Sequence, residues 1–150
     1  MQFRNFSKTG WHVSEIGLGC WQLGGDCWGD LESDTANQIL KTSVDAGINF
    51  FDTADVYGDG RSEEFIGKFI KDCPETIHVA TKLGRRAHVF PDNFTLENLR
   101  ACTEDSLRRL GVETLDLAQL HCLPKEALHQ GDAFQIMRDL QSEGKVRHWG

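Results

Sequence analysis

The chain has 150 residues, a size suited to one globular domain, and 39% of them are hydrophobic while 26% are charged. Its net charge of −7 disfavours binding to phosphate backbones and anionic lipid, so we expect neither nucleic acid nor a membrane as a partner. The first residues lack the apolar segment of a signal peptide, and no stretch approaches the roughly 18 apolar residues of a membrane span. Five cysteines without CxxC or zinc-like spacing indicate reduced thiols and a cytoplasmic protein.

Apolar runs of strand length alternate with helix-like segments along the chain. The predicted strands span residues 16–21, 48–51, 77–81, 115–120 and 145–150. The predicted helices span residues 34–46, 62–71, 96–110 and 133–142. Ser33 or Asp34 is placed to cap the first helix, which Gly47 ends, and Thr95 is placed to cap the third, which Gly111 ends.

Strand and helix in alternation predict an α/β fold with a parallel sheet, because parallel neighbours need a crossover and a helix supplies it. A doubly wound nucleotide-binding sheet would carry a GxGxxG fingerprint after its first strand, and Gly17, Gly19, Gly24 and Gly25 do not form one. The pattern therefore favours a (β/α)8 TIM-type barrel, whose strands end in functional side chains.

Three consecutive predicted strands end on an ionisable residue, respectively Asp52, Lys82 and His121. In a parallel barrel these carboxyl ends share one face, and Tyr57 joins them from the loop after Asp52. Each residue alone has an ordinary explanation: a turn aspartate, a solvated lysine, a hydrogen-bonded core histidine and a rim aromatic. The combination favours an active site.

Several segments carry a family pattern. They are DTADVYG at 52–58 with Ser62-Glu63 and Gly67, ATKLG at 80–84, LRRLG at 107–111 with Asp116, and QLH at 119–121. In this order they resemble the aldo-keto reductase family over essentially the whole chain. The resemblance implies an enzyme that reduces an aldehyde or ketone to an alcohol and binds NADPH without a Rossmann domain.

The resemblance also implies a catalytic tetrad, with Tyr57 as the general acid. Lys82, if close, would stabilise the phenolate, and Asp52 would hold the ammonium as a partly buried ion pair. His121 would donate a hydrogen bond to the substrate carbonyl oxygen, where negative charge develops. Hydride would come from the NADPH cofactor.

The resemblance also leads us to expect further residues around the cofactor and the substrate. The expected cofactor-binding residues are Gly19, Cys20, Trp21 and Asp52, although the first three also suit a simply packed barrel mouth. The expected substrate-binding residues are Trp28, Tyr57 and His121, although Trp28 also suits an ordinary exposed loop aromatic.

Two other chemistries are less favoured. Cys122 follows His121, but no second base is placed to activate it, and we interpret it as a buried structural thiol. A metal held by Asp52 and His121 would be repelled by Lys82, so we expect no metal site.

Eight strands close such a barrel, and residues 1–150 supply about five. We therefore interpret the chain as one partial barrel domain truncated within its fifth strand. The family's remaining strands hold the nicotinamide carboxamide and the adenosine phosphate. Unpaired sheet edges and an apolar inner face would favour self-association. Three alternatives stay open: an inactive fragment, a half-barrel that pairs with a copy or a second half, and a non-catalytic regulatory subunit resembling the β subunits of potassium channels.

Overall fold

A computed structural model describes residues 1–25, 29–130 and 132–150. Its strands are β1 (Phe3–Phe6), β2 (Trp11–Ser14), β3 (Leu18–Gly19), β4 (Phe50–Asp52), β5 (His78–Leu83), β6 (Leu115–Leu120) and β7 (Val146–Trp149). Its α-helices are α1 (Ser33–Asp45), α2 (Arg61–Asp72), α3 (Leu96–Leu110), α4 (Lys125–Gln130) and α5 (Asp132–Ser142). Short 3-10 helices are η1 (Ser7–Thr9), η2 (Trp21–Gly24) and η3 (Tyr57–Gly60).

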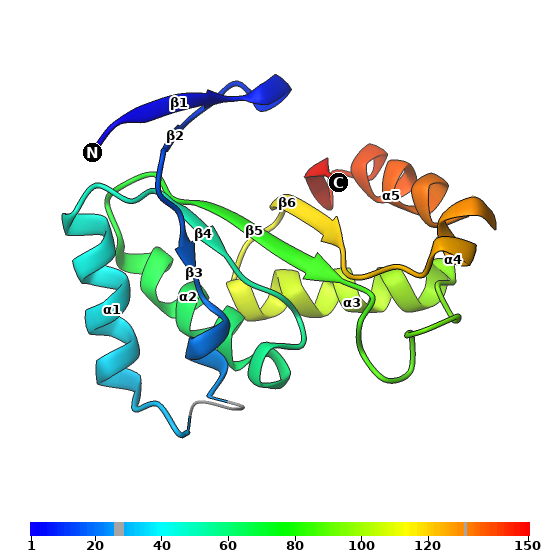
Figure 1. The fold of residues 1–150 in the computed structure, drawn as a ribbon, viewed down its shortest axis with the longest axis horizontal. Helices are drawn as coiled ribbons and strands as arrows, with labels where there is room; N and C mark the ends of the chain where they lie inside the picture. The colour runs from blue at the N-terminus through cyan, green and yellow to red at the C-terminus, as the bar shows by residue number, and fades with distance from the viewer. Residues whose placement is uncertain (26–28, 131) are drawn as a thin grey trace.

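The strands β3 to β7 form one parallel sheet in sequence order. A helix crosses between successive strands, and Figure 1 shows α1, α2 and α3 on one side of the sheet. Strands that follow one another in order, each with its helix outside, make the wall of an incomplete (β/α) barrel. The predicted fold class is therefore confirmed. None of the helices among the described residues is long and apolar enough to cross a membrane.

The main core lies between the sheet and the helices. Alternate strand residues such as Phe51 and Leu83 face this layer and are fully buried. Helix α2 contributes Ile66, α3 contributes Leu99 and α5 contributes Met137, each with no exposed surface. Burying a side chain of this kind contributes about 1.5–3 kcal/mol. Because side chains alternate along a strand, the residues next to these buried ones face the opposite side of the sheet, which is the barrel interior.

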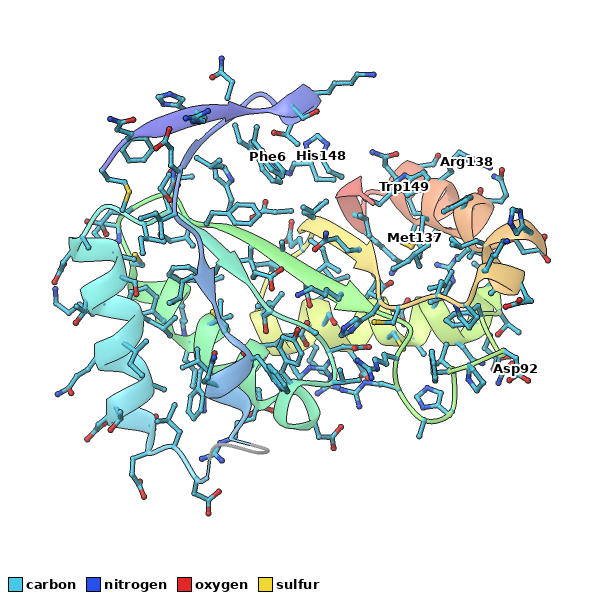
Figure 2. All side chains as sticks on the ribbon, in the orientation of Figure 1. Phe6, Asp92, Met137, Arg138, His148 and Trp149 are labelled. Carbon is cyan, nitrogen blue, oxygen red and sulfur yellow. The ribbon has the colours of Figure 1, made fainter. Side chains whose placement is uncertain are left out.

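A β-hairpin of β1 and β2 precedes the sheet and was not expected from the sequence. Its strands pair antiparallel, and Gly10 turns the chain with a φ of 77°. Trp11 stacks on His78, at the start of β5, with ring centroids 4.4 Å apart, and meets His148 edge-on at 4.9 Å. Figure 2 labels Phe6 and His148 next to each other below the hairpin. The hairpin therefore covers the end of the sheet at which the strands begin, opposite the predicted site.

The element boundaries differ from the predictions where local signals are weak. The first strand pairs only at Leu18–Gly19, and the first helix begins without a side-chain cap, since Glu32 at that position makes no capping hydrogen bond. The predicted cap at Thr95 is present, because its side chain accepts the N–H of Asn98. The short helix α4 was not predicted.

Candidate active site

The ammonium group of Lys82 lies at the centre of the site. The parallel register sets Asp52 opposite Ala80. Lys82 lies two residues after Ala80 on β5, so its side chain projects from the same face of the sheet. Lys82 Nζ donates to Asp52 Oδ2 at 2.7 Å and to the carbonyl of Thr53 at 2.8 Å. The Lys82 side chain is 18% exposed and that of Asp52 is 41% exposed. The pair is therefore ordered by the sheet while its carboxylate still meets solvent.

The phenol ring of Tyr57 is placed by the loop after β4. Pairing with β5 continues into this loop, because the Asp55 N–H donates to the Lys82 carbonyl at 3.1 Å. Gly58, with a φ of 60°, then packs its backbone directly against Gly24, where a Cβ on Gly24 would lie 2.5 Å from the Gly58 nitrogen. Lys82 Nζ lies 5.2 Å from the centre of the Tyr57 ring. Two backbones in contact thus hold the phenol beside the ammonium.

His121 reaches the same place from the end of β6. The backbone N–H of His121 donates to the carbonyl of Leu83 at 2.9 Å, and its ring meets that of Tyr57 edge-on with centroids 6.1 Å apart. The side chain is buried, and its Nδ1 has no hydrogen-bond partner among the described residues. Burial, followed by the charges of Lys82 and Arg85, lowers the pKa of His121 to about 4. The imidazole is therefore neutral at pH 7.

An open pocket of about 280 Å³ contains the phenol and the imidazole. It is lined by Trp21, Val56, Tyr57, Arg85 and His121. The Trp21 ring lies 6.1 Å from that of Tyr57 and is 45% exposed. A larger hollow of about 450 Å³, beside Asp92 at the edge of the molecule in Figure 2, shares no lining residue with this site. The smaller pocket is the one in which the phenol of Tyr57 and the imidazole of His121 meet.

The predicted cofactor-binding residues differ in how they meet the site. A Cβ added at Gly19 would meet nothing within 4 Å, so the backbone there borders open space. Cys20 is buried, its N–H donates to the Asp52 carbonyl at 2.8 Å, and its carbonyl accepts from Ser62 Oγ at 2.7 Å. Burial raises the pKa of the Cys20 thiol to about 12. The buried Cys20 therefore contacts the site through its backbone. Trp28, which was predicted to bind the substrate, lies outside the described residues.

The interpretation of Cys122 as a buried thiol is wrong. Cys122 is exposed, and its φ of 56° turns the chain sharply after His121. The apolar β6 suggested continued burial, but the strand ends at Leu120, two residues before Cys122. Among the described residues, no group of three or more histidine, cysteine, aspartate or glutamate side chains is arranged to hold a metal ion.

Arg86 is a structural contributor that the sequence did not reveal. Its Nη2 donates to the carbonyl of Asp55 at 2.7 Å and its Nη1 to Asp59 Oδ1 at 2.7 Å, so it binds the loop on both sides of Tyr57. The Asp55 carboxylate is fully buried 3.6 Å from Arg86 Nε, and burial raises its pKa to about 6. Arg85 and Arg86 are adjacent in the sequence, and no periodicity indicates that Arg86 is the one that turns inward.

A second buried charge pair lies behind the loop. Arg109 Nε on α3 donates to Glu63 Oε2 on α2 at 2.6 Å, and Thr81 Oγ1 donates to Glu63 Oε1 at 2.5 Å. Glu63 is fully buried and Arg109 is 7% exposed. Both residues fall inside the family pattern, where no individual role was predicted for them. The contacts show that they join α2, α3 and β5 beneath the site.

Comparison with known proteins places this chain in one family. The model described as "Aldo/keto reductase family" matches residues 15–150. The chain therefore belongs to the aldo-keto reductase family. It is 32% identical to aldo-keto reductase YhdN of Bacillus subtilis over its full length, which covers 46% of that relative.

Solved structures agree with this assignment. Aldo-keto reductase AKR11C1 from Bacillus halodurans, in its holo form, superposes with a TM-score of 0.86 at 31% identity over 100% of this chain and 49% of its own. A Klebsiella pneumoniae aldo-keto reductase in complex with NADPH gives 0.81 at 28% identity, over 99% and 48%. The chain thus spans about half the length of the relatives it matches, which fits a barrel wall of five parallel strands.

Proposed function

We propose that this chain reduces the carbonyl group of an aldehyde or ketone with NADPH, and that Tyr57 is its general acid. The observation that carries the proposal is the convergence of Lys82 with Asp52 at 2.7 Å and with the Tyr57 ring at 5.2 Å. A phenol beside an ammonium whose own counter-ion is fixed is arranged to give up a proton and remain as a stabilised phenolate.

The state of the imidazole supports Tyr57 as the acid. With a pKa of about 4, His121 carries no ionisable proton to give at pH 7, but a neutral imidazole still has one N–H to donate as a hydrogen bond. His121 therefore orients the substrate oxygen and stabilises the charge that develops on it. Lys82 Nζ donates to Asp52 and to the Thr53 carbonyl, and this fixed ammonium would stabilise the phenolate.

The residues present fit the reacting end of a nicotinamide cofactor. The backbone at Gly19 borders open space, Trp21 is half exposed beside Tyr57, and the Asp52 carboxylate is open to solvent. These residues would hold the nicotinamide and ribose, and a bound NADPH supplies the hydride. The pocket would hold the carbonyl compound between Tyr57 and His121.

The proposal is tested by measuring NADPH binding and aldehyde-dependent NADPH oxidation with the 150-residue chain. The NADPH fluorescence should change on binding, and an aromatic aldehyde should be turned over. Lys82→Met should lower the turnover number about 10²-fold, because the charge that stabilises the phenolate is lost. Lys8→Met, which changes an exposed lysine of η1, should leave turnover unchanged.

Each contrary outcome has a definite meaning. Binding of NADPH without any turnover would contradict the enzyme and favour a non-catalytic subunit. Absence of both binding and turnover would contradict activity of this chain and favour the inactive fragment. Full turnover by Lys82→Met would contradict the role given to Lys82.

A further inference from the structure

Arg85 differs from the other cations of the site because none of the carboxylates that the structure describes forms an ion pair with it. It follows β5 directly after Gly84 and lines the pocket that holds Tyr57 and His121. Among the described residues it forms no ion pair, and the contact of its Nη1 is with Cys122 Sγ at 3.9 Å. The side chain is exposed, so its guanidinium is free to meet a ligand at the pocket mouth.

The neighbouring positive charges are already neutralised. Lys82 is bound to Asp52 at 2.7 Å, and Arg86 lies between the carboxylates of Asp55 and Asp59. His121 is neutral at pH 7, since its pKa is about 4, and the charge of Arg85 contributes to that lowering. Arg85 shares the pocket lining with Tyr57 and His121, and it gives this lining a net positive charge.

This positive charge opposes the character of the whole molecule. The chain carries a net charge of −7, which repels anions from most of its surface. A guanidinium presents several N–H donors in one plane, a geometry that matches the two oxygens of a carboxylate. The pocket has a volume of about 280 Å³, which suits a small molecule. The charge, the fork geometry and the size together favour a small substrate that bears a carboxylate.

We propose that Arg85 binds the carboxylate of the substrate and so makes the enzyme selective for small aldehydes or ketones that carry an acid group. This inference rests on the proposed function. Arg85 is a specificity-determining residue in this account, because it contacts the far end of the substrate while Tyr57 and His121 contact the carbonyl.

The test compares 4-carboxybenzaldehyde with its methyl ester at constant ionic strength. The wild type should reduce the acid with the higher kcat/KM, mainly through a lower KM. Arg85→Gln should reduce the ratio of the two kcat/KM values about tenfold or more, because a hydrogen-bonded charge is lost. Arg85→Lys, which keeps the charge and loses the planar fork, should retain part of the preference.

A matched variant controls for the change in net charge. Arg138 is exposed on the surface of α5, where Figure 2 labels it, and it bonds Gln135 without lining the pocket. Arg138→Gln should keep the wild-type preference. Equal kcat/KM for acid and ester in the wild type, or an unchanged preference in Arg85→Gln, would overturn the inference while the carbonyl reductase itself stands.

A binding titration separates this inference from the proposed function. Benzoate and benzamide contain neither an aldehyde nor a ketone, so calorimetry with them does not depend on turnover. Benzoate should bind the wild type more tightly than benzamide, and Arg85→Gln should abolish the difference. If neither aldehyde is reduced but the benzoate preference depends on Arg85, the proposed function fails and the carboxylate site stands. Equal binding of both probes would reject the site.

Discussion

Lys82 Nζ and Asp52 Oδ2 lie 2.7 Å apart at the ends of two neighbouring parallel strands. The residues are separated by 30 positions in sequence, and the β4–β5 register alone brings them together. A second bond, from Nζ to the Thr53 carbonyl, fixes the direction of the ammonium. The ion pair is thus an orienting device as well as a neutralising one.

Replacing Asp52 should therefore impair catalysis more than stability. In Asp52→Asn, Lys82 keeps the Thr53 carbonyl but loses its ionic partner, and misplacement of its ammonium by about 1 Å should cost about 10²-fold in turnover. The Asp52 carboxylate is 41% exposed, so the free energy of unfolding should change by less than about 1 kcal/mol. Steady-state kinetics and urea unfolding measure the two effects. Asp45→Asn, at an exposed pair with Lys41, should alter neither strongly.

The contact of Gly58 with Gly24 predicts a sharp steric effect near Tyr57. Gly58→Ala would place a Cβ into the Gly24 backbone at a φ of 60°, and we expect a loss of about 1–3 kcal/mol in unfolding free energy. Gly111→Ala is a matched control, since its φ is 68° and nothing lies within 4 Å of the added Cβ. Equal losses in both variants would show that backbone strain alone, and not the contact, limits this position.

The buried Glu63–Arg109 pair predicts a large, partner-dependent effect on stability. Arg109→Met leaves the fully buried Glu63 carboxylate without its cation and should cost about 3–5 kcal/mol in unfolding free energy. The double variant with Glu63→Gln should cost less than the sum of the single changes. Arg108→Met, which breaks an exposed pair with Asp105, should cost at most about 1 kcal/mol. Strict additivity in urea unfolding would contradict the coupling.

The two shifted groups of the site predict opposite responses to acid. The pKa of His121 falls from 6.5 to about 4, so the unfolded chain binds the proton first, and stability is lost as pH falls through that window. The pKa of Asp55 rises from 3.8 to about 6, so its folded form binds the proton first and opposes the loss.

Urea unfolding at several pH values separates these contributions. His121→Gln should make the loss of stability between about pH 6.5 and pH 4 shallower, and Asp55→Asn should make it steeper. His88→Gln, which changes an exposed histidine, should leave the profile as in the wild type. An identical profile in all three variants would exclude titration of these buried groups as its cause.

Much of the barrel wall was predictable because strand and helix differ in period. Phe51 and Leu83 alternate with site residues along β4 and β5, and this alternation marks the strands clearly. The hairpin was missed because β1 is mostly exposed and Trp11, a buried residue of β2, packs against residues far along the chain, such as His78. No local pattern encodes such a contact.

Some residues of the candidate site could likewise be predicted from the sequence, and others could not. Asp52, Lys82 and His121 could be proposed from the sequence because each lies at the end of a predicted apolar strand, which is a local signal with a spatial consequence. The inward turn of Arg86 toward Asp55 and the outward turn of Cys122 depend on loop backbone angles that residue types do not encode. Arg85 has no ion pair among the residues that the structure describes, whereas Arg86 pairs with Asp55, and this distinction required the fold.

The most direct test of the central claim is the turnover number of Tyr57→Phe with NADPH and an aldehyde. Tyr57 is the chain's one tyrosine, so this variant removes every phenol while keeping the ring that faces Lys82. We predict unchanged NADPH binding and a turnover number lower by about 10²–10⁴-fold. A Tyr57→Phe chain that reduces the aldehyde at the wild-type rate would contradict the account, because no phenol would then be needed for the proton.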